Sequence, residues 1–261
     1  MLLQQEGFLL SSCLSVGLTE LGNAHVQNKG AFYTALFNLS VGTERLLKSI
    51  VIIDHMLNNN LDVPSKKEMK QYGHNIAGLY DACEKISRIR CVQIVERDQL
   101  DLIDQELLML LSDFGKVTRY HNLDVLSSSP VGEDPLSQWS KILLAVLDKD
   151  VSKPQKEKIL SQAKLISSSI DDITFTLMHD LDQTPITTEE ALSLPGLHEQ
   201  AARYVILRLV KLLSRLRDLI SELSGMSYTL GLAQPPFPQM QEFLEWLWDD
   251  RQFVLRKKKW P

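Results

Sequence analysis

Residues 31–57 read AFYTALFNLSVGTERLLKSIVIIDHML, and this stretch predicts the class of the fold. Its apolar side chains recur at intervals of three and four residues, the spacing of one face of an α-helix. This face comprises Phe32, Ala35, Leu36, Leu39, Gly42, Leu46, Ile50, Ile53 and Leu57. Gly42 lowers helix propensity, so its place on the apolar face indicates that another helix packs close to the backbone there.

The same spacing continues through most of the chain, and alternation of period two is almost absent, so we expect no strands. Ser65 and Glu68 have the spacing of a helix capping box. Asp98 is the expected cap of a helix that runs to Phe114. The other expected helices cover residues 2–26, 31–57, 76–89, 136–147, 154–181, 188–194 and 197–223. Long helices joined by short connections predict an all-α antiparallel helical bundle.

Residues 127–135 are the clearest linker, because they combine serines, a glycine, two prolines and two acids. The linker divides the chain into residues 1–126 and a helical region of residues 136–261. The pattern leaves open whether the second region is a separate domain or adds helices to the same core.

The overall composition predicts a soluble, cytoplasmic protein. Hydrophobic residues make up 44% of the 261 positions, which is enough for a sizeable core. The net charge of -5 gives no general attraction to nucleic acid or to an anionic membrane, so any polyanion must bind at a local patch. Neither a signal peptide nor an apolar run long enough to span a membrane is present. Three cysteines without metal-ligand spacing indicate reduced thiols.

Residues 118–124, TRYHNLD, are the first candidate site, because five different polar functional groups fall within one or two helical turns. Arg119 and Tyr120 could hold a phosphate while His121 moves a proton. Asn122 or Asp124 could fix the tautomer of the imidazole. The alternative is an ordinary helix end, with Tyr120 packed and the charged residues solvated or paired.

Two other places carry candidate polar groups. His74 stands at the start of a helix, where it could meet a substrate anion, although a capping or packed turn residue is the simpler interpretation. Asn38 and Arg45 lie seven residues apart on one helix face. Arg45 there could bind a phosphate, and a structural ion pair with another helix is the alternative.

A basic row, Arg208, Lys211 and Arg215, lies on the helix predicted over residues 197–223, and residues 256–259 add four positive charges. Both groups could contact RNA phosphates, and a solvated charged face is the alternative. Sequence motifs of zinc sites, nucleoside triphosphatases and serine hydrolases are absent, so we expect neither a metal nor a cofactor.

Residues 30–48, GAFYTALFNLSVGTERLLK, resemble the long core helix of HEPN (higher eukaryotes and prokaryotes nucleotide-binding) domains. Gly73-His74-Asn75 and the apolar helix that leads into Arg119-Tyr120 extend the resemblance over about the first half of the chain. It implies an all-α bundle that forms a homodimer, places its polar residues at the dimer groove, and acts in bacterial toxin–antitoxin or phage-defence systems. Active members of the family are metal-independent endoribonucleases whose signature is an arginine followed by a histidine after four to six residues.

This sequence departs from that signature, because no arginine is followed by a histidine at that spacing. Lysines do precede His55, His74 and His121 at suitable gaps, but a lysine lacks the planar fork of a guanidinium. Two functions therefore remain open. One is a degenerate HEPN-type ribonuclease or toxin component with Arg119, His121 and His74 as catalytic residues. The other is a non-catalytic helical module that binds RNA, a nucleotide, or a protein such as an antitoxin.

Overall fold

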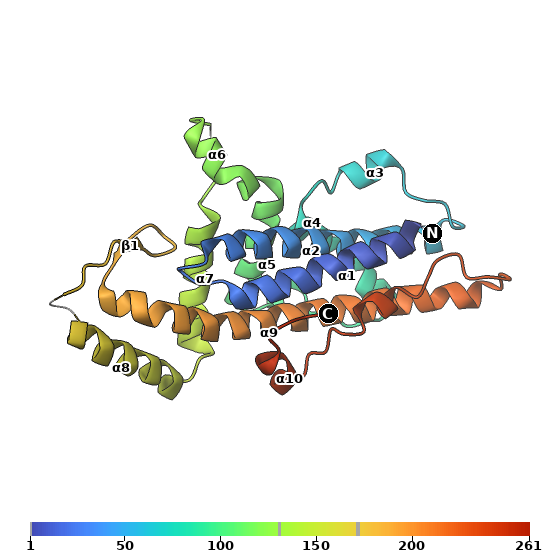
Figure 1. Cartoon of the computed structure of the whole chain (residues 1–261). Coiled ribbons are helices and arrows are strands. Elements are labelled where there is room, and N and C mark those ends of the chain that lie inside the picture. The colour runs from blue at the N-terminus through green and yellow to red at the C-terminus, as the bar shows by residue number, and fades with distance from the viewer. Residues whose placement is uncertain (1, 130–131, 171–172) are drawn as a thin grey trace.

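The computed structural model describes residues 2–129, 132–170 and 173–261, and it confirms an all-α helical bundle. Its centre is an antiparallel pair, α1 (Leu2–Asn23) and α2 (Lys29–Asn58), with the long helix α9 (Thr188–Met226) running beside both (Figure 1). The expected linker 127–135 leads into a helix that begins at its last residue, Pro135, and two of its residues, 130 and 131, fall outside the described residues.

The α1–α2 pair is close because each helix presents a glycine to a leucine of the other. A Cβ on Gly42 would come within 2.8 Å of the Leu14 side chain and 3.1 Å of its backbone nitrogen. A Cβ on Gly17 would come within 2.7 Å of the Leu39 side chain. The structure therefore confirms the prediction that a helix packs against the backbone of Gly42.

A second layer packs on the other side of α2. It consists of α4 (Ile76–Arg90) and α5 (Leu102–Lys116), joined by a segment that contains the 3₁₀ turn η1 (Arg97–Gln99). The predicted capping box at Ser65 is present and begins the short helix α3 (Lys66–Lys70). The prediction that Asp98 caps α5 is wrong. Asp101 is the cap, because its side chain accepts the backbone N–H of Asp104, whereas Asp98 lies within η1.

After α5 the chain forms the 3₁₀ turn η2 (Thr118–Tyr120) and the short helix α6 (His121–Leu126), and then α7 (Pro135–Lys149) crosses the bundle (Figure 1). The helix α8 (Lys153–Ile170) ends well before residue 181, so the prediction of one helix over residues 154–181 is wrong. Beyond it, β1 (Met178–His179) pairs antiparallel with β2 (Pro185–Ile186), which also corrects the expectation of no strands. The Asp182 carboxylate accepts two hydrogen bonds from Thr184 in this hairpin turn, and such side-chain bonds compete with helix formation.

The expectation of two helices over residues 188–194 and 197–223 is also wrong, because α9 continues through Pro195. A proline inside a helix removes one backbone hydrogen bond, so packing on both sides of it must compensate. Ser193 before it and His198 after it are buried, and α8 lies against Gly196, where a Cβ would meet Ile159 at 3.3 Å.

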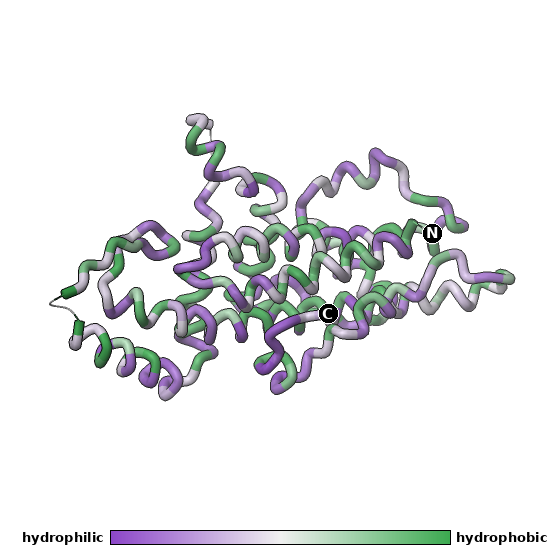
Figure 2. The backbone as a smooth tube through the Cα atoms, in the orientation of Figure 1, coloured by the Kyte–Doolittle hydropathy of each residue, from purple (hydrophilic) through white to green (hydrophobic). Residues whose placement is uncertain are grey.

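One connected hydrophobic core includes residues from both sides of the segment 127–135, among them Phe32 and Trp139, whose ring centroids lie 5.7 Å apart. Figure 2 shows apolar residues alternating with polar ones along the long helices. The 3₁₀ turn η3 (Ser227–Leu230) follows α9. The C-terminal segment, with η4 (Met240–Leu244) and α10 (Arg251–Arg256), returns to α1, where Trp246 donates to Ser11 at 3.0 Å. No helix in the described residues is both long and apolar enough to cross a membrane.

Candidate functional site

One face of α2 contacts three of the candidate residues, which come from three different segments. Tyr33 accepts a hydrogen bond from the Asn122 side chain at 3.1 Å. One turn later, the Arg119 guanidinium lies over the Phe37 ring, 5.2 Å from its centroid.

Further along the same face, both carboxylate oxygens of Glu44 lie within 3.2 Å of Nδ1 of His74. Tyr33 and Glu44 are eleven residues apart, which corresponds to about 16 Å along a helix. The candidates therefore form a row on α2 and do not meet in one pocket. Glu44 is also paired with Lys48 at 2.7 Å, so the imidazole of His74 faces a carboxylate that is already shared.

Three polar atoms near η2 stand out because they are buried and have no hydrogen-bond partner among the described residues. They are Oγ1 of Thr118, Nε of Arg119 and Nδ1 of His121. Buried polar atoms in folded proteins are nearly always paired, so such a group needs an explanation. A ligand that reaches this turn could supply the missing partners.

The other predicted residues take separate positions. Arg45 donates to Glu6 on α1, which is the structural ion pair that was its alternative interpretation. Asn38 donates to the backbone oxygen of Thr34 one turn earlier, at 2.9 Å. Tyr120 is exposed. Asp124 accepts from Ser127 and Ser129 through its backbone oxygen, and no side-chain hydrogen bond joins it to His121 in the described residues.

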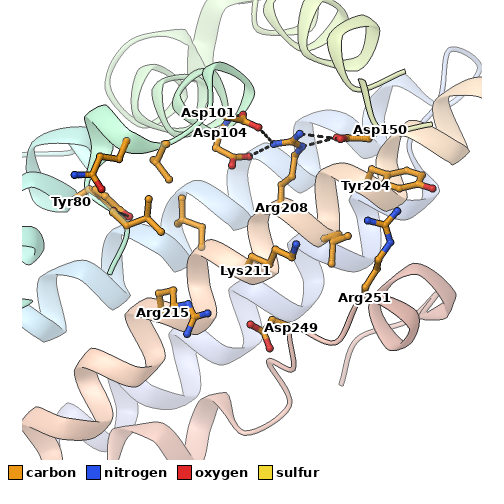
Figure 3. Close-up of a pocket in the computed structure, with 15 residues that line it drawn as sticks. Tyr80, Asp101, Asp104, Asp150, Tyr204, Arg208, Lys211, Arg215, Asp249 and Arg251 are labelled. Atoms are coloured by element: carbon orange, nitrogen blue, oxygen red, sulfur yellow. Dashed lines mark hydrogen bonds and ion pairs between the residues drawn. The ribbon is translucent and has the colours of Figure 1, made fainter. Parts of the chain in front are cut away.

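A cavity of about 490 Å³ lies elsewhere in the bundle, between α9, the start of α5 and the segment that leads into α10 (Figure 3). The basic row predicted from the sequence lines it, because Arg208, Lys211 and Arg215 fall on one face of α9. Tyr204, one turn before Arg208, and Arg251 complete this wall.

Arg208 is the most completely paired charged residue at the cavity. Its guanidinium donates to Asp101 at 2.7 Å, to Asp104 at 2.8 Å, and to both oxygens of Asp150 at 2.7 and 3.1 Å. Burial alone would raise the pKa of Asp101, but hydrogen bonds from Lys149 and Arg208 outweigh it and lower that pKa below its usual range. Arg208 thus ties the beginning of α5 and the end of α7 to α9.

The remaining cations of the cavity form fewer hydrogen bonds and ion pairs than Arg208 does. Arg215 lies 3.8 Å from Asp218. The Arg251 guanidinium lies 5.6 Å from the centre of the Tyr204 ring. Neither Lys211 nor Arg251 forms an ion pair with a described residue. Tyr80 contributes its ring to the opposite wall, and its hydroxyl is already donated to the backbone oxygen of Val95 at 2.6 Å.

Sequence reasoning recognised the basic row but missed the residues that face it. Asp101, Asp104, Asp150, Tyr204 and Arg251 carry no motif, and only the three-residue spacing of Asp101 and Asp104 at a helix start could have drawn attention to two of them. Their proximity to Arg208 depends on how distant helices pack.

The chain matches no protein-family model, and it matches neither a curated protein nor a solved structure.

Proposed function

We propose that this chain is a HEPN-like RNA-binding protein and that the turn at residues 118–124 contacts the phosphates of RNA. The observation that carries the proposal is the set of unpartnered buried atoms at this turn, which includes Nε of Arg119 and Nδ1 of His121. A guanidinium is a charged donor that suits phosphate, and because the two atoms are buried, a phosphate oxygen could accept from them only after the turn rearranges to expose them.

The position of Arg119 suits phosphate binding. Its guanidinium lies over the Phe37 ring, and such a cation–π contact restrains the side chain. Tyr120 and Leu123, which follow it in the chain, are 61% and 62% exposed. An aromatic side chain beside a cation also offers a surface on which an unpaired base can stack.

Binding is better supported than cleavage. General acid–base catalysis needs both the phosphate-binding group and the proton-transfer group within hydrogen-bond reach of the reacting atoms. His74 contacts Glu44, about 10 Å along α2 from the Phe37 position that Arg119 covers. The absence of an arginine followed by a histidine after four to six residues also favours binding over cleavage.

The test is fluorescence anisotropy of a labelled single-stranded RNA in the presence of a chelator. We expect Arg119→Ala to weaken binding about tenfold and to lower the salt dependence by about 0.7 in the log–log slope, because one phosphate contact is lost. Arg203→Ala is the matched control, since it removes an arginine paired with Glu199 on α9. Equal affinities of the wild type and the Arg119→Ala variant would contradict the proposal.

A second candidate is the degenerate metal-independent endoribonuclease or toxin component, and the free Nδ1 of His121 favours it. In that reaction the 2′-hydroxyl attacks phosphorus, the bond to the 5′-oxygen breaks, and His121 accepts or returns the proton. Cleaved RNA would carry a 2′,3′-cyclic phosphate. His121→Ala should then abolish cleavage and leave most of the binding. Intact RNA at every enzyme concentration would exclude this candidate.

The same surface is our proposed partner interface, in a cytoplasmic defence or toxin–antitoxin setting. Leu123 and Leu126 are 62% and 82% exposed on α6, beside the proposed phosphate contact. A homodimer or an antitoxin that covers them would bury apolar area and could complete the site. We expect the wild type to be a dimer and the Leu123→Arg variant to be a monomer when their molar masses are measured by light scattering. A variant with the same mass as the wild type would contradict this assignment.

A further inference from the structure

The cavity beside α9 is independent of the turn at residues 118–124, and the arrangement of its charges indicates a ligand. The geometry points to a binding site for a small phosphorylated molecule, held by Lys211, Arg215 and Arg251. The volume of about 490 Å³ falls within the range of small-molecule sites, whereas a strand of RNA needs an extended groove.

The residues that line the cavity include equal numbers of acids and bases, but the acids and the bases are unevenly distributed along it. Four acids and four bases line the cavity. Three of the acids, Asp101, Asp104 and Asp150, hold Arg208 at one end, as the dashed lines in Figure 3 show. The remaining three bases share the other end with a single acid, Asp249. Among the lining residues that end therefore has more positive than negative charge, and Asp218, which lies 3.8 Å from Arg215 and 2.8 Å from Arg217, is shared between two arginines. A phosphate monoester dianion would neutralise the excess.

The three bases come from two parts of the chain. Lys211 and Arg215 are one turn apart on α9, and Arg251 is the first residue of α10. All three are exposed at the cavity, so binding a phosphate does not require breaking a buried ion pair. Charges from two elements therefore line the cavity, and arginines and lysines bind phosphate oxygens through charge-assisted hydrogen bonds.

The segment that carries Asp249 and Arg251 is fixed to α9. Arg217 on α9 donates to the backbone oxygen of Leu247, four residues before Arg251. Arg251 in turn rests on the ring of Tyr204. These two contacts restrain the segment that carries Arg251, so less conformational entropy is lost there when a ligand binds.

Calorimetric titration of the whole chain with inorganic phosphate and with adenosine 5′-monophosphate tests this site. We expect Lys211→Met and Arg251→Met each to weaken binding about tenfold, since each removes a charge-assisted hydrogen bond. Asp249→Asn should strengthen binding, because it removes the one acid at the basic end. Lys158→Met, on the exposed side of α8, is the charge-matched control and should leave the affinity unchanged.

Unchanged melting temperatures confirm that these variants fold, which is expected for exposed side chains. Two results would overturn the proposal. One is the absence of binding heat with either ligand at millimolar concentration. The other is an equal loss of affinity in Lys158→Met and Lys211→Met. A short single-stranded RNA serves as the third ligand, and if Lys211→Met abolishes RNA binding, the site takes polymer phosphate and the small-molecule assignment is wrong.

Discussion

Replacing Arg208 with methionine tests how much the arginine–aspartate cluster contributes to stability. The Arg208 side chain is only 12% exposed, and the side chains of Asp101, Asp104 and Asp150 are 33%, 25% and 20% exposed. Methionine keeps much of the aliphatic volume but removes every hydrogen bond to these carboxylates. Three acids would then remain together, with Lys149 as the remaining cation bound to Asp101.

The expected loss is about 3 kcal/mol in the free energy of unfolding. Removing one partner from a buried ion pair costs about 3–5 kcal/mol, because the remaining charge is left uncompensated in a poorly solvated place. The lower end applies here, since the carboxylates are a fifth to a third exposed and water relieves part of the penalty. A loss of this size lowers the melting temperature by about 6–12 °C in a chain of this length.

The loss should depend on pH in a defined direction. The lowered pKa of Asp101 means that its ionised form stabilises the fold above about pH 4, and this contribution disappears as the pH falls further. Burial raises the pKa of Asp104 despite its bond to Arg208, so ionisation of that group opposes folding at neutral pH. In the methionine variant the carboxylates of Asp101 and Asp104 lose the guanidinium that favours their ionised forms. The difference between the two proteins should therefore be largest near pH 7 and should shrink below about pH 4.

Urea denaturation of both proteins at pH 7, 5 and 3.5 measures this difference. Arg203→Met is the control, because Arg203 forms an exposed pair with Glu199 and should cost less than about 1 kcal/mol. A loss below about 1 kcal/mol for Arg208→Met, or one that stays constant with pH, would refute the assigned role of the cluster.

Two further predictions concern the core. Burial lowers the pKa of His198 to about 4, so the folded protein resists its protonation and should lose about 3 kcal/mol of stability as the pH falls from 6.5 towards 4. His198→Gln should flatten this part of the pH profile in urea denaturation, and an unchanged profile would count against the explanation. Gly42→Ala should cost about 1–3 kcal/mol, because the added Cβ meets Leu14, whereas Gly30→Ala has nothing within 4 Å and should be neutral or stabilising. Thermal denaturation compares the two, and equal effects would show that helix packing is not the cause.

Much of the fold could be predicted because the information is local. The apolar face of α2, the close approach at Gly42 and the capping box at Ser65 depend on residues a few positions apart. The errors arose where another interaction outweighed a local rule. Pro195 predicted a helix end, but packing against α8 keeps α9 continuous. The helical pattern predicted for residues 154–181 stops at Ile170, and the chain then forms the β1–β2 hairpin around Asp182.

The candidate site was less predictable, because its contacts join distant positions. Arg208 meets Asp101 across 107 residues and Asp150 across 58, and no spacing rule connects them. The basic row on α9 could be recognised from its helical spacing, but the cavity in front of it could not. The polar composition of residues 118–124 indicates a candidate phosphate contact, whereas the row of contacts with α2 depends on how the helices pack.

The length of α9 has a consequence for biosynthesis. This helix of 39 residues contacts α1, α2, α7, α8 and α10, so helices made early in translation bury part of their apolar surface only against a late one. When α1 and α2 have emerged from the ribosome, α9 has not yet been synthesised. The apolar residues of α9 between 205 and 223, which pack in the same core, are therefore still missing. We therefore expect a fragment of residues 1–126 to aggregate when expressed alone and to regain solubility when α9 is supplied as a separate peptide.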